Sequence, residues 1–142
     1  MAQPTWRPVL ENLTVPEKKG VAWSCALDFL PPGKLIKILV DPSATWKPNQ
    51  FSVAVGADGD PGASRNPGKL ILESAPLGAL IGRLGISSAG PRTDELIFPV
   101  GRHCVLTVPP EKGGALYFGV NDAETLLGLV EGSLKVSIFE SL

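Results

Sequence analysis

The chain has 142 residues, of which 44% are hydrophobic and 19% are charged, with 14 acidic side chains against 13 basic ones. This length suits one domain, 1–142, with a single core, because folding at this size buries roughly two-thirds of the surface of the unfolded chain. The near-neutral charge gives no attraction for a polyanion, so nucleic acid is not an expected partner. No apolar run approaches the roughly 20 residues of a membrane span, so none is expected.

The N-terminus and the cysteines bear on the cellular compartment. Residues 1–7 contain no apolar region of a standard signal peptide, so the cytoplasm is the default expectation and export would need a non-standard route. Cys25 and Cys104 are too few for the disulfide framework of a small exported domain. We expect two free, buried thiols, since an isolated cysteine behaves as a small hydrophobic side chain. A bridge between them is the alternative if the protein is exported.

Short apolar runs separated by turns follow one another along the whole chain, and 16 glycines and 14 prolines are scattered between them. Residues 1–20 are expected to be a loose edge segment with a short strand near Leu13. Residues 21–29 alternate in polarity, which predicts a half-buried strand. Further strands are expected at 35–40, 51–55, 69–73, 79–84, 96–100, 103–108, 115–120 and 133–139, with a helical turn or two only at 123–130.

This succession of strands predicts an all-β fold, an antiparallel β-sandwich or jelly roll of about eight or nine strands. The spacing leaves no room for the helices that parallel strands would need. The side chains expected in the core are Trp23, Cys25, Leu27, Leu80, Phe98, Leu116, Phe118, Val136 and Ile138.

Two positions stand out as candidates for ligand binding. Trp46 lies in a polar, proline-bounded loop, and indoles in such loops often stack on sugar faces or partner surfaces. The alternative is that Trp46 folds back as a lid over the edge of the core. Asn121 and Asp122 end a predicted strand, where both side chains readily cap a turn; the alternative is a ligand role toward a metal or a sugar hydroxyl.

Other polar positions give weaker signals. Asp58 and Asp60 lie two residues apart in a glycine-rich loop, but the third acid and the distant glutamate of a calcium loop are missing. His103 is the single histidine, and on a strand it points to the opposite face from its neighbour Cys104, so the two cannot act as base and nucleophile for each other. A catalytic triad or a His-rich zinc site therefore lacks members, and we expect His103 to be structural and the chain not to be an enzyme.

The order of motifs in the second half of the chain is that of a known family. The segments GALIGRLG (78–85), GALYFGVND (114–122) and GSLKV (132–136) follow one another. This order resembles the PA-I-type galactophilic lectins, a bacterial-type family of galactose-binding-like β-sandwiches. Upstream, the segments LPPGKLI (30–36), GD (59–60) and RNP (65–67) are similar to further parts of the family pattern. The resemblance covers roughly residues 30–138.

The resemblance implies a carbohydrate-binding, lectin-like module for a galactose-type sugar, assembled as a homo-oligomer. Asp122 matches the ligand aspartate of the family, and Trp46 stands where the family has a tyrosine beside the metal. Asn66 replaces a sugar-contacting histidine, and Asp60 lies in the loop on the sugar side. The sugar-binding residues implied are therefore Trp46, Asp60, Asn66 and Asp122.

Calcium binding is not expected. The two adjacent asparagines with which the family binds calcium fall here on Leu129 and Val130, whose side chains carry no oxygen. Calcium takes six to eight oxygen ligands, and Asp122 is the only side-chain candidate retained. We therefore expect sugar binding without the family's calcium site and without another cofactor.

The alternative is a non-sugar interaction or structural domain that kept the lectin fold. The apolar loop Leu126 to Val130 would then contact a protein partner or a second copy of the chain.

Overall fold

A computed structural model describes residues 5–50, 52–62, 70–85, 96–109, 113–122 and 128–142. These ranges contain ten strands, all paired antiparallel, and no helix. The strands are β1 (Trp6–Val15), β2 (Trp23–Leu30), β3 (Leu35–Val40), β4 (Trp46–Lys47), β5 (Leu80–Gly85), β6 (Leu96–Pro99), β7 (His103–Thr107), β8 (Gly114–Val120), β9 (Glu131–Gly132) and β10 (Leu134–Ser141). The predicted all-β antiparallel sandwich is confirmed.

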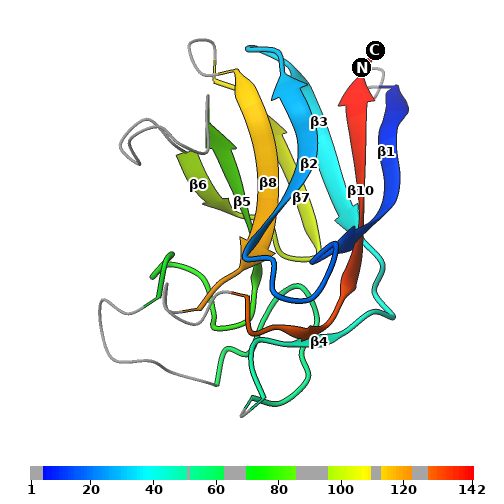
Figure 1. Ribbon diagram of the computed structural model, residues 1–142. Coiled ribbons are helices and arrows are strands. Elements are labelled where there is room, and N and C mark those ends of the chain that lie inside the picture. The colour runs from blue at the N-terminus through cyan, green and yellow to red at the C-terminus, as the bar shows by residue number, and fades with distance from the viewer. Residues whose placement is uncertain (1–4, 51, 63–69, 86–95, 110–112, 123–127) are drawn as a thin grey trace.

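Two four-stranded sheets, in the orders β1-β10-β3-β7 and β2-β8-β5-β6, form the two layers of the sandwich (Figure 1). The short ribbon β4-β9 lies at the end of the sandwich opposite the chain termini. We call this the loop end and define it as residues 41–62, 70–79, 99–102, 121–122 and 128–133. Loops at one end of a sandwich are held in place by both sheets, which makes this end the natural position for a binding site.

The core lies between the two sheets and is built from alternate side chains of the strands. The side chains that are fully buried include Ile36, Ile38, Leu80, Leu116, Phe118, Leu134, Val136 and Ile138. Burying each such side chain stabilises the fold by about 1.5–3 kcal/mol relative to leaving it exposed. Phe98 is only half-buried, and its ring lies over Gly82, where an added Cβ would come within 2.4 Å of the phenyl Cζ. Gly82 is thus a close-packing position between β5 and β6.

The prediction of which face of β2 is buried is wrong. Cys25 is exposed and Trp23 and Leu27 are half-buried, whereas Ser24 and Leu30 are buried. The pairing of β2 with β8 shifts register between Cys25 and Leu27 and again before Leu30. These shifts interrupt the alternation of faces, but Ser24 precedes the first of them and pairs with the fully buried Phe118. The inward face at the start of β2 is therefore the less apolar one, which the polarity pattern of the strand does not reveal.

The prediction of two free thiols is confirmed, but their burial differs from the expectation. Cys25 is exposed on β2 and Cys104 is half-buried on β7, in the opposite sheet. Burial raises the pKa of the Cys104 thiol. The pKa of Cys25 is raised by partial desolvation and then by the nearby carboxylate of Asp28.

Two predicted strands are absent from the described residues, and one predicted loose segment is ordered. Ser52 to Ala54 form no strand, and Val55 makes a single bridge to Trp46. Residues 71–75 form turns and bends instead of a strand. Within the expected loose segment, residues 6–15 form β1 and pair with β10 over most of that length, so this part is an edge strand rather than a loose wrap.

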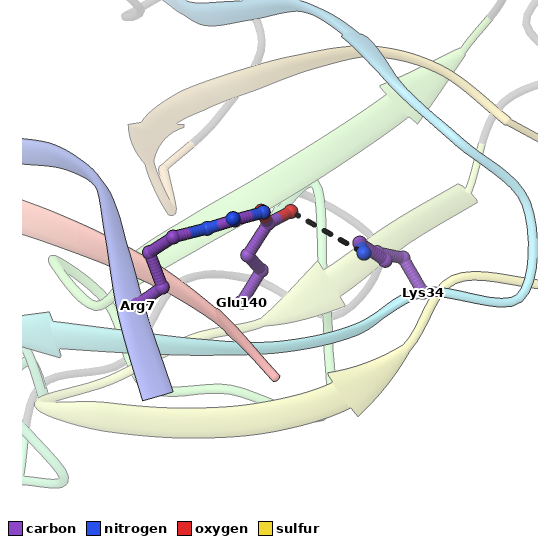
Figure 2. Close-up of polar contacts among 3 residues, drawn as sticks. All are labelled: Arg7, Lys34 and Glu140. Atoms are coloured by element: carbon purple, nitrogen blue, oxygen red, sulfur yellow. Dashed lines mark hydrogen bonds and ion pairs between the residues drawn. The ribbon is translucent and has the colours of Figure 1, made fainter. Parts of the chain in front are cut away.

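An ion-pair cluster lies near the termini, at the end of the sandwich opposite the loop end. Glu140 of β10 lies between Arg7 of β1 and Lys34, the residue before β3 (Figure 2). Arg7 donates hydrogen bonds to Oε1 of Glu140 from Nε (3.0 Å) and from its guanidinium terminus, and Lys34 Nζ lies 3.7 Å from Oε2. The hydrogen bond from Arg7 is the main cause that lowers the pKa of Glu140.

Candidate functional site

The loop end joins segments that are far apart in the sequence. The indole Nε1 of Trp46 donates a hydrogen bond to the carbonyl of Gly78 (2.8 Å), and the backbone N–H of Gly78 donates to the carbonyl of Asn121 (2.8 Å). The N–H of Asp60 donates to the carbonyl of Leu77 (2.8 Å). The three loops that carry Trp46, Asp60 and Asp122 therefore meet at one end of the sandwich.

Trp46 does not present its ring to a ligand. Its side chain is 1% exposed and belongs to the core cluster, while its backbone pairs with Gly132 of β9 and Val55. A stacking contact needs an accessible ring face, so the prediction of a sugar-stacking tryptophan is wrong and the alternative, a lid over the edge of the core, is correct. The proline-bounded loop gave the misleading signal: polar neighbours in sequence do not make a residue exposed.

Asp122 is also turned inward. It is fully buried, and its Oδ2 accepts a hydrogen bond from Nδ2 of Asn49 (3.2 Å), which is itself 5% exposed. The backbone carbonyl of Asp122 accepts from the N–H of Ile71 (3.1 Å). A buried carboxylate is costly unless hydrogen bonds satisfy it, and here it ties the end of β8 to the loop after β4. The carboxylate is thus turned inward, but the hydrogen bond described links it to a distant loop rather than capping its own turn.

Asn121 holds the loop 72–76 in place. Its Nδ2 donates to the carbonyls of Leu72 (2.8 Å), Ala75 (2.9 Å) and Pro76 (3.1 Å), and its Oδ1 accepts from the N–H of Leu72 (3.0 Å). The side chain is fully buried. The Asn-Asp pair at a strand end indicated a cap in the sequence, and the structure extends that role to a whole loop.

The remaining predicted positions are distributed as follows. Asp60 is half-buried, and its Oδ1 accepts from the N–H of Gly62 (2.9 Å), closing its own turn. Asn66 lies outside the described residues, as do Leu126 and Leu127 of the apolar loop. In the described part of that loop Leu129 is 53% exposed, while Val130 is 6% exposed and packs in the core cluster. Leu129 is thus the one described residue of this loop that offers an apolar surface.

A depression of about 470 Å³ lies at the loop end, beside the turn 100–102 that joins β6 to β7 and that we call the β6–β7 corner. The sequence did not predict this depression. Asp58 and His103 line it together with the exposed Val105, and the imidazole of His103 is exposed rather than built into the core. Asp58 stood out in the sequence only as part of an incomplete calcium loop, and His103 was expected to be structural, so neither was a candidate for sugar binding. The proximity of two segments 45 positions apart depends on the pairing of the sheets and has no local signal.

Metal and membrane sites are absent from the described part of the chain. No three or more His, Cys, Asp or Glu side chains lie close enough together there to hold a metal ion. Within the same ranges no helix is long and apolar enough to cross a membrane.

Comparison with known proteins identifies the fold. No protein-family model matches the chain, and no curated protein does. Solved structures do match, among them the EclA N-terminal domain, a PllA-like lectin, with a TM-score of 0.56 and 20% identity over 94% of this chain and 97% of that domain. The chain therefore has the fold of a lectin domain over nearly its whole length, and this match bears on the fold rather than on the PA-I-type family.

Proposed function

We propose that this chain is a carbohydrate-binding, lectin-like module. The observation that carries the proposal is the structural match to a lectin domain, which covers 94% of this chain and therefore extends over both sheets and the loops between them. Fold alone does not determine function, so the proposal also relies on the loop end, where hydrogen bonds between distant segments hold polar groups on a rigid scaffold.

The proposed ligand is a galactose-type sugar, and the proposed mode of binding does not use calcium. Two observations support calcium independence. Val130, at the position of one family asparagine, is buried in the core, and the carboxylate of Asp122 is engaged by Asn49. A calcium ion at this position would have to take the carboxylate from that contact and find its remaining oxygen ligands elsewhere.

A binding role is favoured over catalysis. The adjacent His103 and Cys104 differ in exposure, as expected for opposite faces of β7, so they do not form a base–nucleophile pair. Binding of a single sugar by a shallow site is weak, and a homo-oligomer that presents several sites raises avidity by 10² to 10⁴ without new contacts. Homo-oligomerisation is therefore part of the proposal.

A glycan array probed with the full chain, with and without EDTA, tests the proposal. We expect binding to galactose-terminated glycans that EDTA leaves unchanged, and a melting temperature that EDTA also leaves unchanged, because a metal bound only to the folded state would raise it. Binding abolished by EDTA would refute the calcium-free mode alone. An absence of binding to any glycan would refute carbohydrate recognition, and a protein partner captured through Leu129 would then favour the interaction-domain alternative.

A further inference from the structure

The depression beside the β6–β7 corner combines polar and apolar walls. Its volume of about 470 Å³ lies within the range of small-ligand sites. Asp58 and His103 supply polar side chains, and Pro76, Pro99 and Val105 supply apolar walls. Val105 is 47% exposed, so its side chain offers an accessible apolar surface to the depression.

The walls of the depression are held in position without a ligand. The backbone N–H groups of Val100 and Gly101 both donate to the carbonyl of Leu80 (3.0 and 3.1 Å), and the N–H of Leu80 donates to the carbonyl of Ala57 (2.8 Å). Nδ2 of Asn121 donates a hydrogen bond to the carbonyl of Pro76 (3.1 Å), which holds this further wall residue in position. A site that is already in its bound shape loses little entropy when a ligand enters.

Asp58 is oriented by its surroundings and remains accessible. Its Oδ1 accepts a hydrogen bond from the N–H of Arg102 (2.9 Å), and its Oδ2 lies 3.8 Å from Nε of Arg102, yet 62% of the side chain is exposed. Gly101 makes room for it: the residue has φ +65°, and an added Cβ would come within 2.7 Å of Oδ1. Because a carboxylate has about four acceptor positions, Asp58 keeps acceptor capacity for two ligand hydroxyls.

Backbone groups of β7 add further donors and acceptors. The carbonyl of Arg102 accepts from the N–H of Val40 (3.0 Å), and the N–H of Val108 donates to the carbonyl of Lys34 (2.7 Å), so the even-numbered positions pair with the β3 side. In an antiparallel ladder alternate residues pair with the same neighbour. The N–H and C=O groups of His103 and Val105 therefore point to the other side of β7, which is the edge of its sheet.

We propose that this depression, between Asp58 and His103, is a sugar-binding subsite and that its ligand is a neutral pyranose with two adjacent hydroxyl groups. The inference rests on the proposed carbohydrate-binding function and deepens it. The Asp58 carboxylate accepts hydrogen bonds from both hydroxyls, His103 pairs with a third polar group, and a C–H face of the sugar ring packs on Pro99 and Val105. An acidic sugar is disfavoured because its carboxylate would be repelled by Asp58.

NMR provides a direct test, because His103 is the single histidine and its imidazole Cε1–H signal needs no assignment by mutagenesis. The isotope-labelled full chain is titrated with methyl galactoside, methyl glucoside and methyl mannoside. We expect saturable shifts of the His103 signal and of the Gly101 and Arg102 amide signals with at least one of these sugars. A Cys104 alkylation assay gives a second measurement: the bound sugar should slow its reaction, while the exposed Cys25 serves as the internal control.

The matched variants are Asp58→Asn and Asp41→Asn. Both remove one negative charge from a turn-capping aspartate at the loop end, since Asp41 Oδ1 accepts from Ser43 N–H (2.9 Å), but Asp41 does not line the depression. Asp58→Asn should raise the Kd of the sugar at least tenfold, and Asp41→Asn should leave it unchanged, with both variants folded as judged by their amide spectra.

Each outcome decides a separate question. If the chain binds a glycan while the His103 signal stays unmoved and the two variants bind equally, the subsite is refuted and the proposed function stands. If neither the array nor the titration detects any sugar, both are refuted.

Discussion

Replacement of Asn121 by alanine should loosen the loop end while leaving the two sheets intact. The side-chain amide of Asn121 has two N–H hydrogens but contacts three carbonyl acceptors, so two of the acceptors share one hydrogen. Together with the hydrogen bond that Oδ1 accepts from Leu72, the side chain makes about three full hydrogen bonds. At about 1 kcal/mol each, Asn121→Ala should destabilise the fold by about 3 kcal/mol. For a chain of this length that corresponds to a fall in melting temperature of roughly 6–12 °C.

Asn121→Asp is the matched variant for this prediction. It keeps an acceptor for the N–H of Leu72 but places a buried carboxylate against the carbonyls of Ala75 and Pro76. The loss should therefore be at least as large as for alanine at neutral pH and smaller in acid, where the carboxyl group can donate. Thermal denaturation followed by circular dichroism measures both variants. A fall of less than about 2 °C for Asn121→Ala would refute the role of Asn121 as the support of loop 72–76.

The remaining predictions concern the core lid, the terminal ion-pair cluster and metal dependence. Trp46→Phe removes the donor to the buried Gly78 carbonyl and should cost about 1–3 kcal/mol; an unchanged melting temperature would contradict the lid role. Arg7 lowers the pKa of Glu140, so this stabilisation is present above about pH 4.3, the unfolded value, and is lost as pH falls through the folded pKa. Glu140→Gln should therefore destabilise the protein at pH 7 and flatten its acid denaturation profile; an unchanged profile would exclude this contribution. EDTA should leave the melting temperature within error of its value in buffer, and a fall of several degrees would reveal a metal site.

Much of the fold was predictable because most strands have a recognisable local sequence pattern. The run at 35–40 is apolar and bounded by turn residues, and it forms β3 over those same residues. The strands at 80–85, 114–120 and 134–141 also follow their patterns closely. The strand predictions fail where pairing with a distant segment determines the structure. β4 and β9 have two residues each, and they form because Trp46 and Lys47 pair with Gly132 and Glu131.

The described candidate residues lie together at the loop end, but the directions of their side chains could not be predicted from the sequence. The loops of Trp46, Asp60 and Asp122 do meet, because they follow strands that end at the same edge of the sandwich. The direction of each side chain depends on partners that have no sequence signal, such as the Gly78 carbonyl for Trp46 and Asn49 for Asp122. Asp58 and His103 were overlooked for the same reason, since their proximity depends on the β6–β7 corner.

The energetics of the two carboxylates favour Asp58 over Asp122 as the group that meets a ligand. A monosaccharide that binds with a Kd of about 1 mM has about 4 kcal/mol of binding free energy at its disposal. To reach Asp122, it must expose a fully buried carboxylate and break the bond from Asn49, which costs about 1–3 kcal/mol before any contact forms. Asp58 is 62% exposed and already oriented by Arg102, so binding there breaks no buried contact. Asp122, which resembles the ligand aspartate of the PA-I-type lectins, therefore serves this loop end as a support, and Asp58 is the carboxylate that the proposed sugar would contact.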